Sequence, residues 1–164
     1  NVESMLVGTT LALVLISFIL MLALRSFRVG LVSLAPNLLP AGMAFGIWGF
    51  TVGQVGMSLS VVTGMTLGIV VDDTVHFLSK YLRARREKGL NTEQAIRYAF
   101  NTVGVALWVT SLVLVAGFIV LAQSHFSLNA DMGVMTAVTI AIALIMDFLF
   151  LPPLLMKLEE KRHV

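Results

Sequence analysis

Long uninterrupted apolar runs dominate the chain. The stretch from Ser4 to Leu24 contains no charged residue, and the stretch from Val29 to Val71 contains none either. Because an α-helix rises about 1.5 Å per residue, roughly 20 apolar residues cross the hydrocarbon core of a bilayer. The second run is too long for one helix, and the glycine-rich segment at 49–56 divides it. The pattern therefore predicts successive membrane-spanning helices.

The same pattern continues to the end of the chain and predicts an all-α, polytopic transmembrane bundle. The intervening segment 80–100 is basic and polar, and we expect it to form a cytoplasmic interfacial linker. Within it, Asn91 and Gln94 have the spacing of a capping box that opens a helix at Thr92. A polar loop is expected from Gln123 to Asp131. The expected spans are 4–24, 29–49, 57–79, 101–122 and 132–156.

Composition supports a membrane protein and argues against several other classes. The chain is 58% hydrophobic and 12% charged, with a mean hydropathy of +0.95, whereas soluble domains carry roughly 25% charged residues. The net charge of +2 is best explained by membrane topology, so no nucleic-acid partner is expected. The chain has no cysteine, which excludes disulfides, a thiolate nucleophile and cysteine metal sites.

The basic residues predict the orientation of the bundle. All 11 lie at one face of a five-span arrangement, while the opposite connections carry only Glu3 and Asp131. By the positive-inside rule the basic face is cytoplasmic, so the chain starts outside and its C-terminus is cytoplasmic. Five spans starting with Asn1 suggest a sequence that begins within a larger protein. The basic residues are Arg25, Arg28, Lys80, Arg83, Arg85, Arg86, Lys88, Arg97, Lys157, Lys161 and Arg162.

Three carboxylates lie inside the predicted spans: Asp72, Asp73 and Asp147. Asp72 precedes Lys80 by eight residues, which places it about 12 Å inside that end of the helix. A charged group at the bilayer centre costs roughly 2.5–3.5 kcal/mol even on the lenient insertion scale. Such residues face a bundle interior or a water-filled cavity, and the default hypothesis is an ion or proton pathway.

The adjacent pair Asp72–Asp73 is the strongest candidate for a proton relay, because two neighbouring carboxylates in a low dielectric resist double ionisation. Gly64, Gly68, Asp72 and His76 recur every four residues and form one stripe along the helix. The two glycines would let a neighbouring helix approach closely. His76 either relays a proton toward the cytoplasm or only pairs with a carboxylate at the interface.

Other polar residues are expected to support the structure. Asp147 would pair with hydroxyl groups or with a charge on another helix, and Thr110 and Ser111 would satisfy backbone carbonyls. Asn37, between Pro36 and Pro40, would stabilise a proline-distorted helix. The remaining outer-loop groups, His125 and Asp131, have no metal-ligand spacing, so neither a metal nor a cofactor is expected.

The motifs together resemble permeases of the RND superfamily, in the branch of MMPL-type and hopanoid exporters and Patched-like sterol-sensing proteins. The similar runs are PNLLP at 36–40, GIVVDDTVHF at 68–77, TSLVLVAGF at 110–118 and LPPLL at 151–155. Their order covers nearly the whole chain, and the combination is more specific than any one string.

The resemblance implies the eighth to twelfth helices of a twelve-helix permease, with Asp72 on the acidic position of the tenth helix and Asp73 beside it. It implies a proton-driven exporter of lipids or other hydrophobic molecules in the bacterial inner membrane. Its partners would be membrane lipid, protons, the remaining half of the permease and possible further copies. The multidrug branch instead places its Asp pair in the fourth helix and commonly a Lys in the tenth, so a drug-efflux function is disfavoured.

Two alternatives to a transporter remain. A sterol-sensing-like module would bind lipid without pumping, and it would tolerate neutral residues in place of Asp72 and Asp73. An intramembrane aspartyl protease would need two carboxylates that share a proton. That enzyme class is disfavoured because Gly68 is followed by Ile-Val-Val before Asp72, so its Gly-x-Gly-Asp string is missing. No enzymatic activity is therefore expected.

Overall fold

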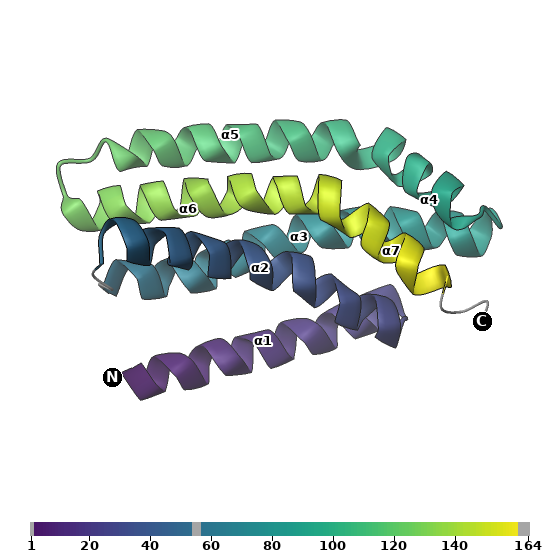
Figure 1. The fold of residues 1–164 in the computed structure, drawn as a ribbon, viewed down its shortest axis with the longest axis horizontal. Helices are drawn as coiled ribbons and strands as arrows, with labels where there is room; N and C mark the ends of the chain where they lie inside the picture. Colours follow the sequence, from purple (N-terminus) through teal and green to yellow (C-terminus); the bar gives the residue numbers. More distant parts are fainter. Residues whose placement is uncertain (1, 54–56, 161–164) are drawn as a thin grey trace.

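The computed structural model describes the backbone of residues 2–53 and 57–160, and the side chains of 7–8, 10–12, 14–53 and 61–159. That part is helical apart from short connections, and its long helices run side by side as a bundle (Figure 1). The all-α fold predicted from the sequence is thus confirmed. The elements are α1 (Val2–Leu24), α2 (Phe27–Thr51), α3 (Met57–Glu87), α4 (Thr92–Ala99), the π-helix η1 (Phe100–Gly104), α5 (Val105–Ala122), α6 (Ser127–Ile145), the π-helix η2 (Met146–Phe150) and α7 (Leu151–Glu160).

Four continuous helical stretches have the length and apolarity to cross a membrane: Phe27–Thr51, Val61–Glu87, Thr92–Ala122 and Ser127–Glu159. Each corresponds to one of the predicted spans. Within the helix predicted as the first span, the described residues form a shorter apolar stretch, Thr10–Leu24. The structure therefore agrees with a multi-pass bundle of four membrane-length helices and a shorter one.

Tight connections join the first helices. Arg25 adopts a left-handed backbone conformation with a φ of 47°, which reverses the chain directly after α1. The Ser26 side chain then accepts a hydrogen bond from the Val29 N–H and caps the start of α2. At the other end, α2 stops at Thr51, and Gly53 follows with a φ of 70°. The predicted break at 49–56 is confirmed there, although its residues 54–56 lie outside the described part.

The polar segment 80–100 contains the end of α3, a short non-helical connection and α4. Helix α3 continues beyond its predicted span to Glu87, and α4 begins at Thr92. Asn91 accepts from the Gln94 N–H, and the Gln94 side chain accepts from the Asn91 N–H. This reciprocal pair is the predicted capping box.

The polar loop after α5 is shorter than predicted. Helix α6 begins at Ser127, so the expected loop residues from Ser127 to Asp131 are helical. Gly133 explains why the two helices can run so closely together. A Cβ atom at this position would lie 2.5 Å from the Ala122 nitrogen and 2.7 Å from the Phe118 carbonyl oxygen, which is closer than real Cβ atoms come. This close approach was not predicted.

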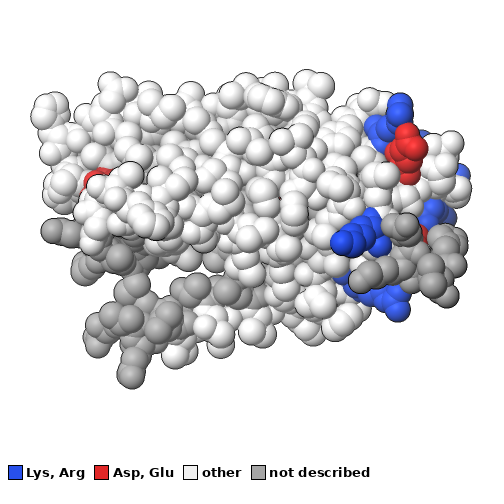
Figure 2. Space-filling model, in the orientation of Figure 1, with Lys and Arg blue, Asp and Glu red and all other residues white. Residues whose placement is uncertain are grey.

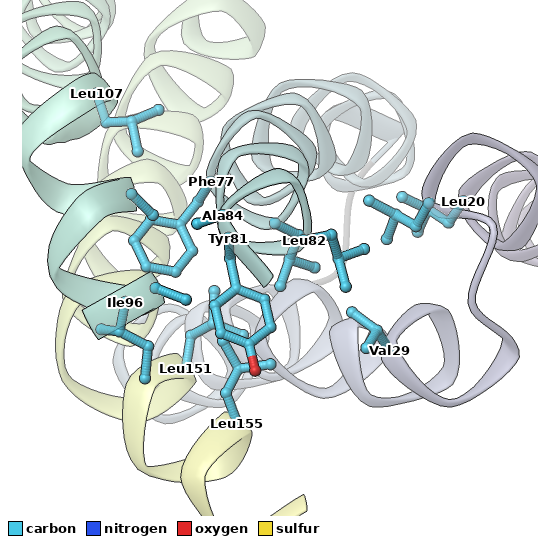
Figure 3. Packing of buried hydrophobic residues seen from close by; sticks show 14 residues of the cluster. Leu20, Val29, Phe77, Tyr81, Leu82, Ala84, Ile96, Leu107, Leu151 and Leu155 are labelled. Carbon is cyan, nitrogen blue, oxygen red and sulfur yellow. The ribbon is translucent and has the colours of Figure 1, made fainter. Parts of the chain in front are cut away.

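The larger of two apolar clusters lies toward the basic end of the bundle and joins α1, α3, α4 and α7 (Figure 3). Phe77, Tyr81 and Leu155 are almost fully enclosed in it. A smaller cluster of Ala44, Trp48, Val62 and Met135 holds α2, α3 and α6 together toward the other end. Helix α3 contributes to both clusters and is therefore central to the packing.

Lysine and arginine gather at one end of the bundle, as Figure 2 shows for one face. Some of these residues also connect elements there. Arg86 donates to the carbonyl oxygens of Leu24 and Arg25 at the end of α1. Arg85 donates to the Leu90 carbonyl and forms a 2.7 Å ion pair with Glu159 of α7. The basic end is thus both a charged surface and a tie between helices.

Candidate ion-pathway site

Three consecutive residues of α3 carry the polar chemistry of the bundle, and they point in different directions. Successive residues of an α-helix are rotated by about 100°. Asp72 consequently lies on an exposed face, Asp73 is directed toward α5, and Thr74 is enclosed between α2 and η2. One helical turn therefore supplies polar groups to an exposed face, to the adjoining groove toward α5 and to a buried cluster.

The exposed environment contains Asp72 and His76. The His76 Nε2 atom lies 3.7 Å from the Asp72 Oδ1 atom, and 62% and 72% of their side-chain surfaces are accessible. Gly64 and Gly68 continue this stripe, and a Cβ atom on either would meet nothing within 4 Å. Asp72 and His76 also line a groove toward α5, whereas the two glycines have no close neighbour among the described residues. The predicted close approach of a helix to these glycines therefore remains a prediction.

The second environment is a groove of about 580 Å³ between α3 and α5. The Ser111 hydroxyl donates to the Asp73 Oδ2 atom at 3.2 Å and connects the two helices. The sequence predicted that the Ser111 hydroxyl would donate to a backbone carbonyl, but its described hydrogen bond runs to Asp73 instead. The neighbouring Thr110 does bond to its own helix, at 2.9 Å from the Ala106 carbonyl oxygen. Apart from polar residues of α3 and Thr110, the groove is lined by Ile69, Val103, Ala106, Leu107, Val109, Val113 and Leu114.

The third environment is a buried cluster that connects α2, α3 and η2. The Thr74 Oγ1 atom lies 2.7 Å from Asn37 Oδ1, 3.0 Å from Asp147 Oδ1 and 3.2 Å from the Val70 carbonyl oxygen. Thr74, Asn37 and Asp147 are 0%, 2% and 3% exposed. The expectation that Asp147 pairs with a hydroxyl group agrees with this contact. Asn37 bonds across the bundle, which its position between two prolines did not predict.

The backbone around Asp147 is a π-helix for a reason that the sequence provides. Proline lacks an N–H group, so Pro152 and Pro153 cannot donate to the carbonyls one turn earlier. The Leu151 N–H bonds instead to the Met146 carbonyl, five residues back. Such π-bulges in α-helices occur frequently at functional sites. Here the bulge brings Asp147 toward Thr74.

The two π-helices meet through aromatic side chains. The ring centroids of Phe100 in η1 and Phe148 in η2 are 5.1 Å apart. Phe100 also packs on Phe77 of α3 at 4.8 Å, and Phe148 packs on Trp108 of α5 at 6.2 Å. This aromatic contact holds α3, α5 and η2 around the polar turn of α3.

The structure thus brings the predicted residues together in two groups. Asp72, Asp73 and His76 share one side of α3 with Ser111, while Asp147 belongs to the buried cluster. Thr74 was not predicted as a site residue. Its position directly after two carboxylates was the available signal, because an apolar span tolerates a run of polar residues mainly where they have partners.

The described part of the chain contains no group of three or more His, Cys, Asp or Glu side chains that could hold a metal ion. The polar environments are built from carboxylates, hydroxyls and one amide. Groups of this kind can bind or transfer a small cation.

Comparisons with known proteins agree with this architecture. The model of the MMPL family matches residues 2–162. The membrane protein MJ1562 of Methanocaldococcus jannaschii is 27% identical over 162 residues, which is 99% of this chain and 41% of that protein. The chain therefore spans less than half the length of this relative.

Proposed function

Because this chain belongs to the MMPL family and forms a multi-pass membrane domain, we propose that it drives the export of lipids or other hydrophobic molecules with the proton-motive force. In this proposal Asp72 and Asp73 take up and release protons inside the membrane, and His76 relays them toward the basic end. The domain performs no enzymatic reaction and needs no cofactor.

The observation that carries this proposal is the placement of Asp73. Its carboxylate lies inside a membrane-length helix, at the edge of an open groove, with one hydroxyl donor from Ser111. A carboxylate in this setting has few partners that stabilise its charge, so it gains and loses a proton at little structural cost. Asp147, by contrast, is enclosed in the buried cluster and does not reach this groove.

Charge and exposure support a direction and a partner. The basic end is proposed to face the cytoplasm of a bacterium, with the domain in its inner membrane. His76 lies one turn from Asp72 toward that end. The exposed stripe from Gly64 to His76 is proposed to face the rest of the permease, since an unpaired carboxylate facing lipid is unfavourable. The permease is also proposed to assemble with further copies of itself.

A second function is a lipid-binding sensor that does not pump, similar to a sterol-sensing domain. The apolar lining of the groove favours it, because such a surface accepts a hydrocarbon chain. A sensor of this kind does not need Asp73 to ionise. The two functions therefore differ in their response to Asp73→Asn, which keeps the shape of the side chain and an oxygen that can accept from Ser111 but cannot ionise.

The experiment is transport by the protein that carries this sequence, reconstituted in liposomes with an imposed proton gradient and a fluorescent lipid. We expect Asp73→Asn to lose gradient-dependent export by at least about tenfold, because an amide cannot take up and release the proton. A tenfold loss of rate corresponds to about 1.4 kcal/mol. Lipid binding, measured by quenching of the fluorescent lipid in the same liposomes, should be unchanged in this variant. Asp131→Asn, at the opposite end, is the matched control and should transport normally.

Either of two results would contradict the proposal. Normal gradient-dependent export by both Asp72→Asn and Asp73→Asn would assign the carboxylates a structural role. Lipid binding that persists without any gradient-dependent export in the wild-type protein would favour the sensor.

A further inference from the structure

The buried cluster of Asn37, Thr74 and Asp147 has more acceptors than donors. Three oxygen atoms, from Asn37, Asp147 and the Val70 carbonyl, lie within 3.2 Å of the Thr74 hydroxyl oxygen. That hydroxyl has one hydrogen to donate and two lone pairs. At the same time, the Asn37 Nδ2 group is buried without a hydrogen-bond partner. With the Asn37 amide oxygen facing Thr74, the hydroxyl therefore has fewer hydrogens to donate than it has neighbouring acceptors.

A proton on Asp147 supplies the missing hydrogen. The Thr74 hydroxyl donates across the shortest contact, 2.7 Å to Asn37 Oδ1. Its contact of 3.0 Å with Asp147 Oδ1 is then a hydrogen bond only if the Asp147 carboxyl donates to it. The alternative is two acceptors facing each other in a desolvated site, which is unfavourable.

An ionised Asp147 requires a different arrangement of the same three residues. The amide oxygen and nitrogen of asparagine have nearly the same shape, so the Asn37 side chain can turn over in place. Its Nδ2 group would then donate to Thr74, and the Thr74 hydroxyl would donate to the carboxylate. The surplus of acceptors around the Thr74 hydroxyl disappears in this state, and the amide oxygen moves to the position that Nδ2 occupied. The amide orientation of Asn37 is therefore coupled to the proton on Asp147.

We propose that Asp147 is a second proton-binding site of this bundle, with Thr74 as its hydrogen-bond partner and the Asn37 amide as the group that turns when the proton leaves. No bond other than the carboxyl O–H forms or breaks, and the proton is exchanged with water. The inference does not rest on the proposed export reaction, because the site exists whether or not transport is proton-driven.

Few charged groups surround this site. Among the titratable groups of the described residues, Asp73 precedes Thr74 directly on α3, and its carboxylate is directed toward Ser111 of α5. Asp72 and His76 lie on the exposed face of α3. The remaining described charged residues of the packed elements stand near the ends of these elements. They are Arg28 in the first turn of α2, Lys80, Arg83, Arg85, Arg86 and Glu87 in the last turns of α3, Asp131 in the first turns of α6, and Lys157 and Glu159 in α7. No described basic side chain forms an ion pair with Asp147.

The test is infrared difference spectroscopy of the protein that carries this sequence, reconstituted in liposomes and titrated from acid to alkaline pH. Protonated carboxyl groups give a C=O stretching band that carboxylates lack. We expect one such band from a buried group in the wild-type protein and its loss in Asp147→Asn. Asp73→Asn should keep this band, which separates the site from the Asp72–Asp73 pair.

A matched pair of threonine variants makes the test independent of Asp147→Asn. Thr74→Val removes the partner hydroxyl without changing the shape, so the Asp147 band should shift to higher frequency. Thr66→Val is the control, since Thr66 is equally buried on α3 but donates to its own Val62 carbonyl. It should leave the band unchanged. Circular dichroism establishes that each variant retains its helices.

Three results would overturn the proposal. The first is an identical carboxyl region in the wild-type protein and folded Asp147→Asn at every pH. The second is an unshifted band in Thr74→Val. The third is a band that appears only when choline replaces sodium in the buffer, because the cluster would then bind a sodium ion in place of the proton.

Discussion

On one face of α3 the polar groups Asp72 and His76 keep most of their side-chain surface accessible, whereas on the opposite face Thr74 is completely enclosed by α2 and η2. The two faces lie within one helical turn. On the enclosed face the Thr74 hydroxyl contacts Asn37 of α2 and Asp147 of η2. On the exposed face the only described contact of Asp72 is the 3.7 Å approach of His76.

The glycines make the same contrast in terms of packing. Gly64 and Gly68 have the four-residue spacing of a helix-packing motif, yet a side chain there would meet nothing. Gly133 belongs to no such pair, and it is the position where a Cβ atom would enter a neighbouring backbone. Small residues permit close approach, but the neighbouring helix decides whether it occurs. The exposed face is thus available for an interaction, while the enclosed face is already covered by α2 and η2.

Gly133→Ala should give the largest change in stability. The added Cβ atom meets the backbone of α5 at Ala122, which cannot move aside as a flexible side chain would. We expect destabilisation of about 1–3 kcal/mol, as for other overpacked sites. Thermal unfolding in detergent, followed by circular dichroism, measures it. Gly68→Ala is the control on the exposed face and should unfold with the wild type; equal melting of both variants would contradict the contrast between the faces.

Thr74→Val should have the next largest effect on stability. It leaves the Asp147 carboxyl and the Asn37 amide without their shared partner in a buried site. The expected cost is about 1–3 kcal/mol, because a buried polar group loses its hydrogen bond. Thr66→Val removes only a bond within its own helix and should cost less. Chemical denaturation of the two variants side by side compares them, and a larger cost for Thr66→Val would assign the buried cluster little structural weight.

Arg85→Ala tests whether the contrast extends to the basic end. The Arg85–Glu159 pair is mostly enclosed, at 25% and 18% side-chain exposure, and it ties α3 to α7. We expect a loss of about 1 kcal/mol, since the Leu90 carbonyl also loses a donor. The exposed pair Arg83–Glu87 lies within a single helix and is screened by salt. Arg83→Ala should therefore unfold close to the wild type. If Arg83→Ala loses as much stability as Arg85→Ala, in low and in high salt alike, this reasoning is wrong.

Ser111→Ala should have the smallest effect on stability and a visible effect on function. The hydroxyl donates to Asp73 at 3.2 Å, a long bond at the edge of an open groove. We expect melting close to the wild type. Proton-driven export should fall several-fold, because the Asp73 carboxylate loses its only described donor. Export assays across pH measure this effect, with Thr110→Val as the neighbouring control that bonds its own backbone. Unchanged export at every pH would remove Ser111 from the pathway.

Much of the helical framework was predictable because it follows from local chemistry. The capping box of Asn91 and Gln94 and the break after Thr51 depend only on residues close in sequence. The start of α6 was placed too late, because the polar residues from Ser127 to Asp131 resemble a loop while their backbone is helical. Polarity alone does not distinguish a loop from the exposed first turn of a helix.

The sequence by itself determined that this chain forms membrane-length helices with a basic end, because hydrophobic run length and the position of charge are properties of local segments. It also located carboxylates inside the spans. Only the tertiary structure decided that Asp73 meets Ser111, that Thr74 joins Asn37 to Asp147, and that the glycine stripe stays exposed. Consecutive residues diverge by about 100° around a helix, so their environments depend on which helices pack on each side, and that packing joins residues far apart in the chain.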